Sequence, residues 1–415
     1  MDKILKISQQ TLWQIVVKIT TAVSGFIILG IVSRKYGESG TGDFTLGLTY
    51  LAFFYILSDA SFNAHLMGRL QEKGSQLEWR KLLGVRILWS LFLITFSVVI
   101  VIFLPFNPPS FGFSPTFKLA VILGSITILF YGLNITAHSI FQAKLKYQLD
   151  AIPTFLGVSL GTILIWRLSS FETPVYLMVL GYVLAWFIHS SGTILAAKRF
   201  IKTLSPVFDL VYLKRLFMEV WPLGSTLVLN VIYFRADAFI LSYFKSSAEV
   251  GIYNLAYQVF QAVLVIPTFI MNSFYPMMLE TLKIKINGFS YQIKLAALGL
   301  LLISLLISLV LFALSPVIVS AISGGGFFRS VDALRILSIG LPAYFLSSLA
   351  LWVMVAKKYY KEMLWVYGLG LIFNLLTNLI FIPKYSYIAA SYITGISEYL
   401  ILIFQMVILW RLLKK

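Results

Sequence analysis

The chain has 415 residues, of which 59% are hydrophobic and only 12% charged, about half the charged fraction of ordinary soluble domains. This composition excludes a soluble globular protein, and the absence of cysteine excludes disulfide scaffolds, CxxC redox chemistry and thiolate metal sites. The net charge of +17 would indicate a nucleic-acid partner in a soluble chain, but here we interpret it first as a sign of membrane topology.

Long apolar stretches follow one another along the whole chain. A bilayer core is crossed by about 20 apolar residues in a helix, whereas the strands of a membrane barrel are about ten residues long and alternate apolar with polar. The stretches here are long and apolar on most faces, so we predict an all-α polytopic membrane protein with about twelve transmembrane helices. They cover approximately residues 12–33, 44–66, 83–104, 118–140, 152–168, 175–196, 219–243, 252–277, 294–316, 333–356, 363–382 and 387–410.

The distribution of Lys and Arg predicts the orientation of these spans. Twelve spans place both termini on one side, and that side carries 23 of the 33 Lys and Arg residues, against 8 on the other side and 2 within spans. Because basic residues collect in cytoplasmic loops, we expect both termini in the cytoplasm. Since topology accounts for the basic excess, we expect no nucleic-acid partner.

The chain divides near its middle into two similar halves. The sequence at residues 36–44 resembles that at 245–253, so that Gly42 aligns with Gly251 and Phe44 with Tyr253 at a constant offset of 209. We therefore predict two six-helix lobes, 1–196 and 219–415, which form a parallel repeat related by a pseudo-two-fold axis along the membrane normal. Residues 197–218 mix basic and apolar side chains, which is typical of a cytoplasmic linker with an interfacial amphipathic helix.

Polar side chains inside the predicted spans are the candidate functional residues, because charged groups are costly there. In the first half, Lys18 shares a helical face with Gln14 and Thr21, and the next span carries Asp59 and Asn63 on one stripe. We expect the Lys18 stripe to face the substrate, with an ion pair to a neighbouring carboxylate, or extension of Lys18 to the inner membrane surface, as the alternatives. Asp59 could pair with Lys18, titrate in a coupling step or cap local backbone.

The second half carries a comparable set. Asn230 and Asp237 share a face of their span, while Arg235 points elsewhere, and one of the two charged residues could form an ion pair within its own lobe. Glu398 lies deep in the last span, where a carboxylate is either paired or protonated for much of the time. The remaining candidates lie on one face of the eighth span: Asn254, Gln258 and Gln261.

Signatures of enzymes and metal sites are missing from the sequence. It contains no Walker loop, GxSxG or HExxH motif, and no His/carboxylate cluster with ligand spacing. We therefore expect no enzymatic activity and no cofactor, which leaves H⁺ or Na⁺ coupling open, with Asp59, Asp237 and Glu398 as either coupling residues or structural ion pairs.

Three stretches of the chain resemble the multidrug, oligosaccharidyl-lipid and polysaccharide exporter (MOP) superfamily, and within it the polysaccharide transporter family of Wzx-type flippases. They are residues 11–46, 233–259 and 314–342. The second is the most specific, because it carries the family's pattern of an Asp in the seventh span, an outside turn with an acidic residue and Gly, and then Tyr and Ala. The matching residues are Asp237, Glu249, Gly251, Tyr253 and Ala256.

The resemblance implies a function as well as a fold. It implies two lobes around a central cavity, as in MATE and MOP transporters, which flip an undecaprenyl-pyrophosphate-linked oligosaccharide, such as an O-antigen unit, to the periplasmic leaflet. Its partners would be this lipid-linked substrate, the lipid bilayer and polysaccharide polymerase machinery. The alternatives are a MATE-like ion-coupled drug or metabolite exporter, a peptidoglycan-precursor flippase and, in another class, a membrane polysaccharide polymerase or ligase.

Overall fold

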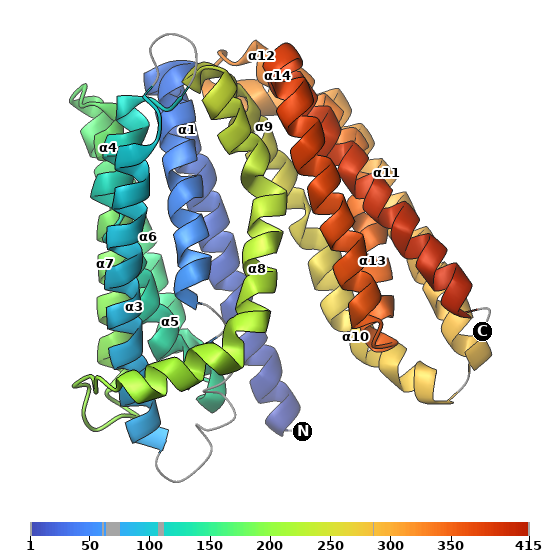
Figure 1. The fold of residues 1–415 in the computed structure, drawn as a ribbon, viewed down its shortest axis with the longest axis horizontal. Coiled ribbons are helices and arrows are strands. Elements are labelled where there is room, and N and C mark those ends of the chain that lie inside the picture. The colour runs from blue at the N-terminus through green and yellow to red at the C-terminus, as the bar shows by residue number, and fades with distance from the viewer. Residues whose placement is uncertain (1, 60–61, 64–74, 107–111, 285, 414–415) are drawn as a thin grey trace. The chain divides into compact units, whose positions relative to one another are not determined.

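The structure is a computed structural model that describes residues 2–59, 62–63, 75–106, 112–284 and 286–413. Within these ranges the side chains of residues 2–9, 11, 75, 221–231, 283–290 and 412–413 are outside the description. The described chain forms helices and contains no named strand (Figure 1). The predicted all-α membrane fold is confirmed.

The described chain divides into two compact units, unit 1 (Met1–Val231) and unit 2 (Ile232–Lys415). The predicted lobe boundaries at residues 196 and 219 stay a prediction. The helices of unit 1 are α1 (Asp2–Asp59), α3 (Ser75–Phe103), α4 (Pro115–Gly124), α5 (Thr127–Lys144), α6 (Gln148–Ser170), η1 (Val175–Met178), α7 (Val179–Ala197) and the first half of α8 (Leu210–Phe244). Unit 2 holds the rest of α8, α9 (Ser247–Val263), α10 (Val265–Ile284), α11 (Ile286–Ser323), α12 (Phe328–Ile339), α13 (Leu341–Ala356) and α14 (Tyr360–Leu413).

Nine helical ranges among the described residues are long and apolar enough to cross a membrane. Two of them, of 48 and 52 residues, are long enough for two crossings, and each is broken by a residue with positive φ. These residues are Gly37 and Ser386, which lie at predicted turns between spans. The predicted number of twelve spans stays a prediction.

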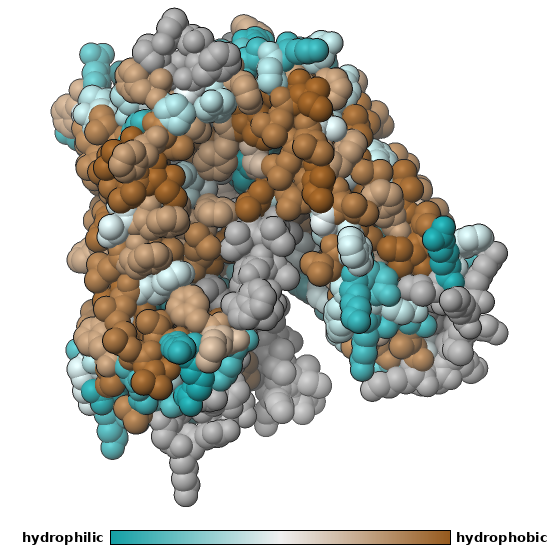
Figure 2. Space-filling model, in the orientation of Figure 1, coloured by the Kyte–Doolittle hydropathy of each residue, from teal (hydrophilic) through white to brown (hydrophobic). Residues whose placement is uncertain are grey.

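The distribution of side chains on α3 is the reverse of that in a soluble helix. Its fully buried face carries Arg86, Ser90 and Ser97, while its exposed face carries Phe92 and Phe96, which are 53% and 45% exposed. Figure 2 shows hydrophobic side chains over the middle of the visible face of unit 1 and hydrophilic ones toward its ends. This distribution suits a lipid environment, in which apolar groups face outward and polar groups are satisfied inside.

Helices α6 and α7 approach so closely that glycine is required at their contact. A Cβ atom on Gly157 would lie 2.5 Å from the backbone oxygen of Ala185, and one on Gly181 would lie 2.6 Å from that of Gly161. Small residues at such contacts let membrane helices pack backbone to backbone. The α6–α7 pair is therefore a rigid part of unit 1.

We expect Gly157→Val to destabilise the protein by about 1–3 kcal/mol or more, the usual cost of overpacking, because the opposing atom is backbone and cannot rotate away. Gly299→Val in α11 is the matched control, since a Cβ there meets nothing within 4 Å. Thermal unfolding in detergent measures both. Equal melting temperatures for the two variants would contradict close packing of α6 on α7.

The start of α8 is held against α3 by an ion pair between Asp209, which directly precedes α8, and Lys81 of α3. Asp209 Oδ1 accepts the backbone N–H of Tyr212 at 2.8 Å, and its Oδ2 lies 2.9 Å from Lys81 Nζ. The hydrogen bond from Tyr212 and the nearby Lys81 lower the pKa of Asp209. Tyr212 and Leu216 then pack with Trp79 in the core of unit 1, where the first turns of α8 cross the ends of other helices (Figure 1).

A lowered pKa in the folded protein means that Asp209 stabilises it only while ionised. Its contribution is fully present above the unfolded pKa of about 3.9 and is lost as the pH falls through the lower folded value. We expect Asp209→Asn to melt below the wild type at neutral pH and the difference to shrink on acidification. A difference that is constant between neutral and acidic pH would contradict this assignment.

Candidate functional site

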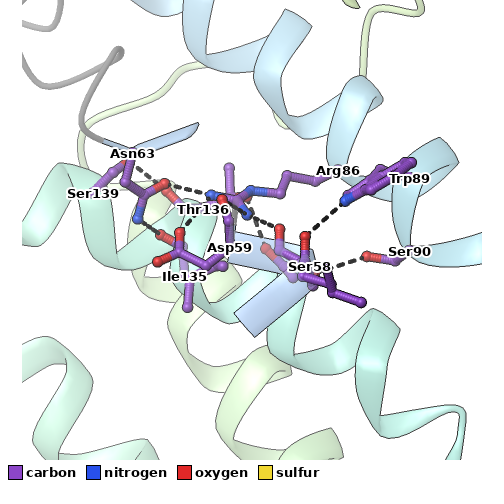
Figure 3. Close-up of polar contacts among 11 residues, drawn as sticks. Ser58, Asp59, Asn63, Arg86, Trp89, Ser90, Ile135, Thr136 and Ser139 are labelled. Carbon is purple, nitrogen blue, oxygen red and sulfur yellow. Dashed lines mark hydrogen bonds and ion pairs between the residues drawn. The ribbon is translucent and has the colours of Figure 1, made fainter. Parts of the chain in front are cut away.

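A buried arginine joins α3 to the last described turn of α1 in unit 1. The Arg86 side chain is fully buried, and its NH1 donates to the backbone oxygens of Ser58, in a short contact, and of Asp59, at 3.1 Å. Its NH2 donates to Asn63 Oδ1 at 2.8 Å and lies 3.4 Å from Asp59 Oδ1. The guanidinium also lies over the ring of Phe62, 5.0 Å from its centroid. Figure 3 shows Ser58, Asp59 and Asn63 around the Arg86 side chain.

Further hydrogen bonds fix the groups that surround Arg86 (Figure 3). Asn63 Nδ2 donates to the backbone oxygen of Ile135 in α5 at 2.8 Å, which orients its side-chain oxygen toward the guanidinium. Trp89, on α3, donates its indole N–H to the backbone oxygen of Leu57 at 2.9 Å. The cluster therefore ties α1, α3 and α5 together around one positive charge.

The Arg86 cluster is partly exposed at the Asp59 carboxylate. The Asp59 side chain is 34% exposed, whereas the Arg86 side chain is 0% exposed. Arg86 Nε has no hydrogen-bond partner among the described residues. An anion that reaches Asp59 would compete for a guanidinium that is already oriented, and removing Asp59 would leave a buried charge uncompensated.

Two buried carboxylates of unit 2 are satisfied by hydroxyl groups. Asp237 on α8 is 3% exposed and accepts the backbone N–H of Ala238 at 2.7 Å, the Thr394 hydroxyl at 3.2 Å and, in a short contact, the Tyr253 hydroxyl. Glu398 on α14 is 4% exposed. It accepts from Tyr233 at 3.0 Å and, in a short contact, from Ser347.

The spacing of these residues allows two hydrogen bonds to join α8 and α14 side by side. Tyr233 and Asp237 are four residues apart on α8, as are Thr394 and Glu398 on α14, so each pair shares a helical face. One hydrogen bond joins Tyr233 to Glu398, and the other joins Asp237 to Thr394. The two helices are thus held in register by polar contacts inside an apolar unit.

Two of the remaining predicted residues of unit 2 are in contact. Arg235 NH2 donates to Gln261 Oε1 at 2.9 Å, and its guanidinium lies 4.6 Å from the ring centroid of Tyr257. Asn254 is buried, and Gln258 is half-buried. Asn230 lies in the part of α8 that belongs to unit 1, and its side chain is outside the described residues. A shared substrate site formed by these residues stays a prediction.

The predicted cationic stripe of α1 lies on its exposed surface. Gln14, Lys18 and Thr21 are all exposed. The Thr21 hydroxyl lies 3.0 Å from the backbone oxygens of both Val17 and Lys18, one turn back along the same helix. A substrate-facing role for this stripe stays a prediction.

Sequence reasoning missed two groups. Arg86 was not among the predicted site residues, although it shares a helical face with Ser90 and Ser97, and these polar residues were the signal that could have found it. His189 was not among them either, and its ring contacts Asp150 of α6. No spacing rule links those two, because they lie on different helices.

Comparison with known proteins identifies the family. The sequence profile described as "Polysaccharide biosynthesis protein" matches residues 7–282, more than half of the chain. The chain belongs to this polysaccharide biosynthesis family. No curated protein matches the sequence.

Solved structures of MOP-type transporters resemble this family member in fold. The lipid II flippase MurJ in its inward closed conformation has a TM-score of 0.75 at 16% identity, covering 96% of this chain and 87% of that chain. An inward-facing multidrug resistance MATE transporter has a TM-score of 0.67 at 14% identity, with 95% and 94% covered. A MOP transporter from Pyrococcus furiosus has a TM-score of 0.62 at 13% identity, with 99% and 95% covered. The profile confirms the predicted polysaccharide family, and the likeness to these transporters is one of fold.

Proposed function

We propose that the protein flips an undecaprenyl-pyrophosphate-linked oligosaccharide, such as an O-antigen repeat unit, across a bacterial inner membrane. The movement runs from the cytoplasmic to the periplasmic leaflet by alternating access, with both termini in the cytoplasm. One observation carries the proposal: a polysaccharide biosynthesis profile covers a chain whose fold matches that of a lipid II flippase. Such a protein moves its substrate without making or breaking a covalent bond, so it is not an enzyme.

The polar groups of the two units suit the chemistry of such a substrate. A glycan carrying a pyrophosphate is anionic and rich in hydrogen-bonding groups, so it needs cations, amides and hydroxyls. Lys18 supplies a cation and Gln14 an amide on the exposed face of α1. Arg235 supplies a cation and Gln261 an amide in unit 2. The same proposal includes coupling of transport to H⁺ or Na⁺ at the intramembrane carboxylates. It also includes a polysaccharide polymerase as the partner protein.

A peptidoglycan-precursor flippase is the second candidate, because MurJ matches the fold at a TM-score of 0.75. The two functions differ in the glycan, since both carriers are lipid pyrophosphates. Rescue of a strain depleted of its lipid II flippase, without rescue of surface polysaccharide in a strain lacking this protein, would favour the second candidate.

A clean deletion in a strain without a redundant flippase tests the proposal. We expect loss of polymerised surface polysaccharide, accumulation of lipid-linked repeat units that face the cytoplasm, and restoration of both by the wild-type gene. Normal surface polysaccharide in the deletion would contradict the proposal.

Lys18→Ala is expected to lower the flipping rate about tenfold at normal protein level. A charge-assisted hydrogen bond to phosphate contributes about 1.5–3 kcal/mol, and 1.4 kcal/mol corresponds to tenfold. Lys144→Ala, which removes an exposed cation at the end of α5, is the matched control and should keep wild-type activity. Full activity of Lys18→Ala would assign Lys18 to structure and not to substrate.

A further inference from the structure

The segment that leads into α8 is fixed against α3 at one end of unit 1. The Val207 backbone N–H donates to the backbone oxygen of Arg80 at 3.0 Å, and Arg80 Nε donates to the backbone oxygen of Ser205 at 2.8 Å. A Cβ atom on Gly84 would lie 2.2 Å from the backbone oxygen of Val207, so glycine is required for this close approach. The segment therefore has a defined position on α3.

The first turns of α8 bury one face and expose another. Tyr212, Leu216 and Val220 follow one another at every fourth position and pack in the core of unit 1. Large apolar side chains of the same region point away from this core and are 57–81% exposed. They are Phe208, just before α8, and Leu210, Val211 and Met218 within it. Apolar side chains that gather on a surface mark a contact with a partner or a membrane.

Basic side chains flank these four apolar residues. Residues 197–218 contain five Lys or Arg residues and one acidic residue, Asp209, which lies 2.9 Å from Lys81 of α3 and is therefore already paired. Within the described part of the chain, none of the five basic residues forms an ion pair, and all are exposed: Lys198, Arg199, Lys202, Lys214 and Arg215. These five residues and the four apolar ones form what we call the linker surface.

The linker surface lies where a membrane boundary is expected. The first turns of α8 run crosswise to α3, at the end of unit 1 where α3 begins (Figure 1). Because Gln76–Phe103 of α3 is long and apolar enough to span a membrane, a helix that crosses its end lies along the membrane surface. Figure 2 shows hydrophobic and hydrophilic side chains side by side at this end of unit 1. Helices in the membrane interface have this mixed character, with apolar side chains among the acyl chains and basic ones at the headgroups.

We propose that the linker surface is a binding surface for anionic phospholipid, whose acyl chains cover the apolar side chains and whose headgroup phosphates contact the basic ones. Charge complementarity favours this occupant, because each Lys or Arg close to an anionic leaflet strengthens association about fivefold. One lipid molecule supplies both the apolar and the anionic groups that the surface needs. The proposal extends the predicted interfacial helix of residues 197–218 to a named ligand class, and it is independent of the proposed transport function.

The chain contains no cysteine, so a single introduced cysteine can report on the linker surface. Val211→Cys, at the most exposed of the four apolar residues, would carry a bimane fluorophore in the full-length protein. Nanodiscs would contain equal amounts of phosphatidylglycerol and phosphatidylcholine, with the acyl chains of one or the other lipid brominated, so that quenching measures which lipid contacts the site. We expect stronger quenching by brominated phosphatidylglycerol, and a smaller difference between the two lipids at high salt.

Charge variants in the Val211→Cys background assign this preference to the linker surface. Lys214→Gln combined with Arg215→Gln leaves the buried face of α8 intact and should lower the affinity for phosphatidylglycerol relative to phosphatidylcholine by about tenfold or more. Arg167→Gln is the matched control. Arg167 is also exposed and lies over an aromatic ring, 4.7 Å from the centroid of Phe171, as Arg215 lies over Tyr212 at 5.6 Å, but it belongs to the last turn of α6. This control should keep the full preference.

Three results would overturn the proposal. Equal quenching by the two brominated lipids would show that the surface does not select anionic headgroups. Quenching by neither lipid would show that the surface faces water or is covered by a protein partner or a second copy of the chain. A double variant that keeps the wild-type preference would show that the anionic lipid binds elsewhere. Since the assay measures lipid contact and not flipping, none of these results depends on the proposed function.

Discussion

Replacing Arg86 by alanine is expected to lower the free energy of unfolding by about 3–5 kcal/mol, because each hydrogen bond that the buried guanidinium donates is worth about 1.5–3 kcal/mol and the volume of the side chain is left empty. The variant would lose the hydrogen bonds to the Ser58 and Asp59 backbone and to Asn63, and would leave Asp59 beside an empty space. We therefore expect little folded protein in detergent at temperatures that the wild type survives.

Two further variants separate charge from packing at Arg86. Arg80→Ala is the matched control, because Arg80 lies on the same helix but is partly exposed, and among the described residues its side chain donates hydrogen bonds to Ser205 alone. It should cost at most about 1 kcal/mol, as solvated surface contacts do. Arg86→Met combined with Asp59→Asn removes both charges and should recover part of the loss. If Arg86→Ala is as stable as Arg80→Ala, the buried cluster does not exist.

Replacing Asp237 by alanine is expected to destabilise unit 2 by about 2 kcal/mol or more, because it leaves the buried Tyr253 hydroxyl without its carboxylate acceptor, at about 1–3 kcal/mol, and leaves an empty space in the unit. The Thr394 hydroxyl keeps an acceptor, because it also donates to the backbone oxygen of Ala390 at 2.8 Å. Chemical denaturation in mixed detergent micelles measures the loss. We expect Asp237→Ala to unfold at clearly lower denaturant than the wild type.

A double-mutant cycle assigns the loss to a named contact. Tyr253→Phe removes one donor, so it should cost about 1 kcal/mol alone and nearly nothing more in the Asp237→Ala background. Glu280→Ala, at an exposed acidic residue of α10, is the matched control. Additive losses for Asp237→Ala and Tyr253→Phe would show that the two side chains do not interact.

The fold class could be predicted because it depends on long apolar stretches, which local composition reveals. The turns at Gly37 and Ser386 were also placed correctly between predicted spans, although the structure forms them as kinks within single helical ranges. The number of spans could not be fixed in the same way.

The candidate sites were predicted less completely, for a physical reason. Asp59, Asp237 and Glu398 stood out because carboxylates inside apolar stretches are costly and must be satisfied. Their partners are Arg86, tyrosines and small hydroxyl residues on other helices. Inspection of a single sequence does not reveal which helix faces are in contact. Arg86 was also hidden by its place near a span boundary, where basic residues usually mark topology and not a buried contact.

The most direct test of the proposed function is a flipping assay with purified protein. Liposomes would contain fluorescently labelled undecaprenyl-pyrophosphate-linked repeat units, and an impermeant quencher would report the fraction in the outer leaflet over time. We predict that the wild-type protein brings the labelled lipid of the inner leaflet to the outer leaflet, where the quencher reaches it. In protein-free vesicles this lipid should stay protected, and with the Lys18→Ala protein it should become quenched more slowly. An inner-leaflet pool that stays protected in vesicles with correctly folded wild-type protein, driven by either a proton or a sodium gradient, would contradict the proposal that this protein is a flippase for lipid-linked oligosaccharides.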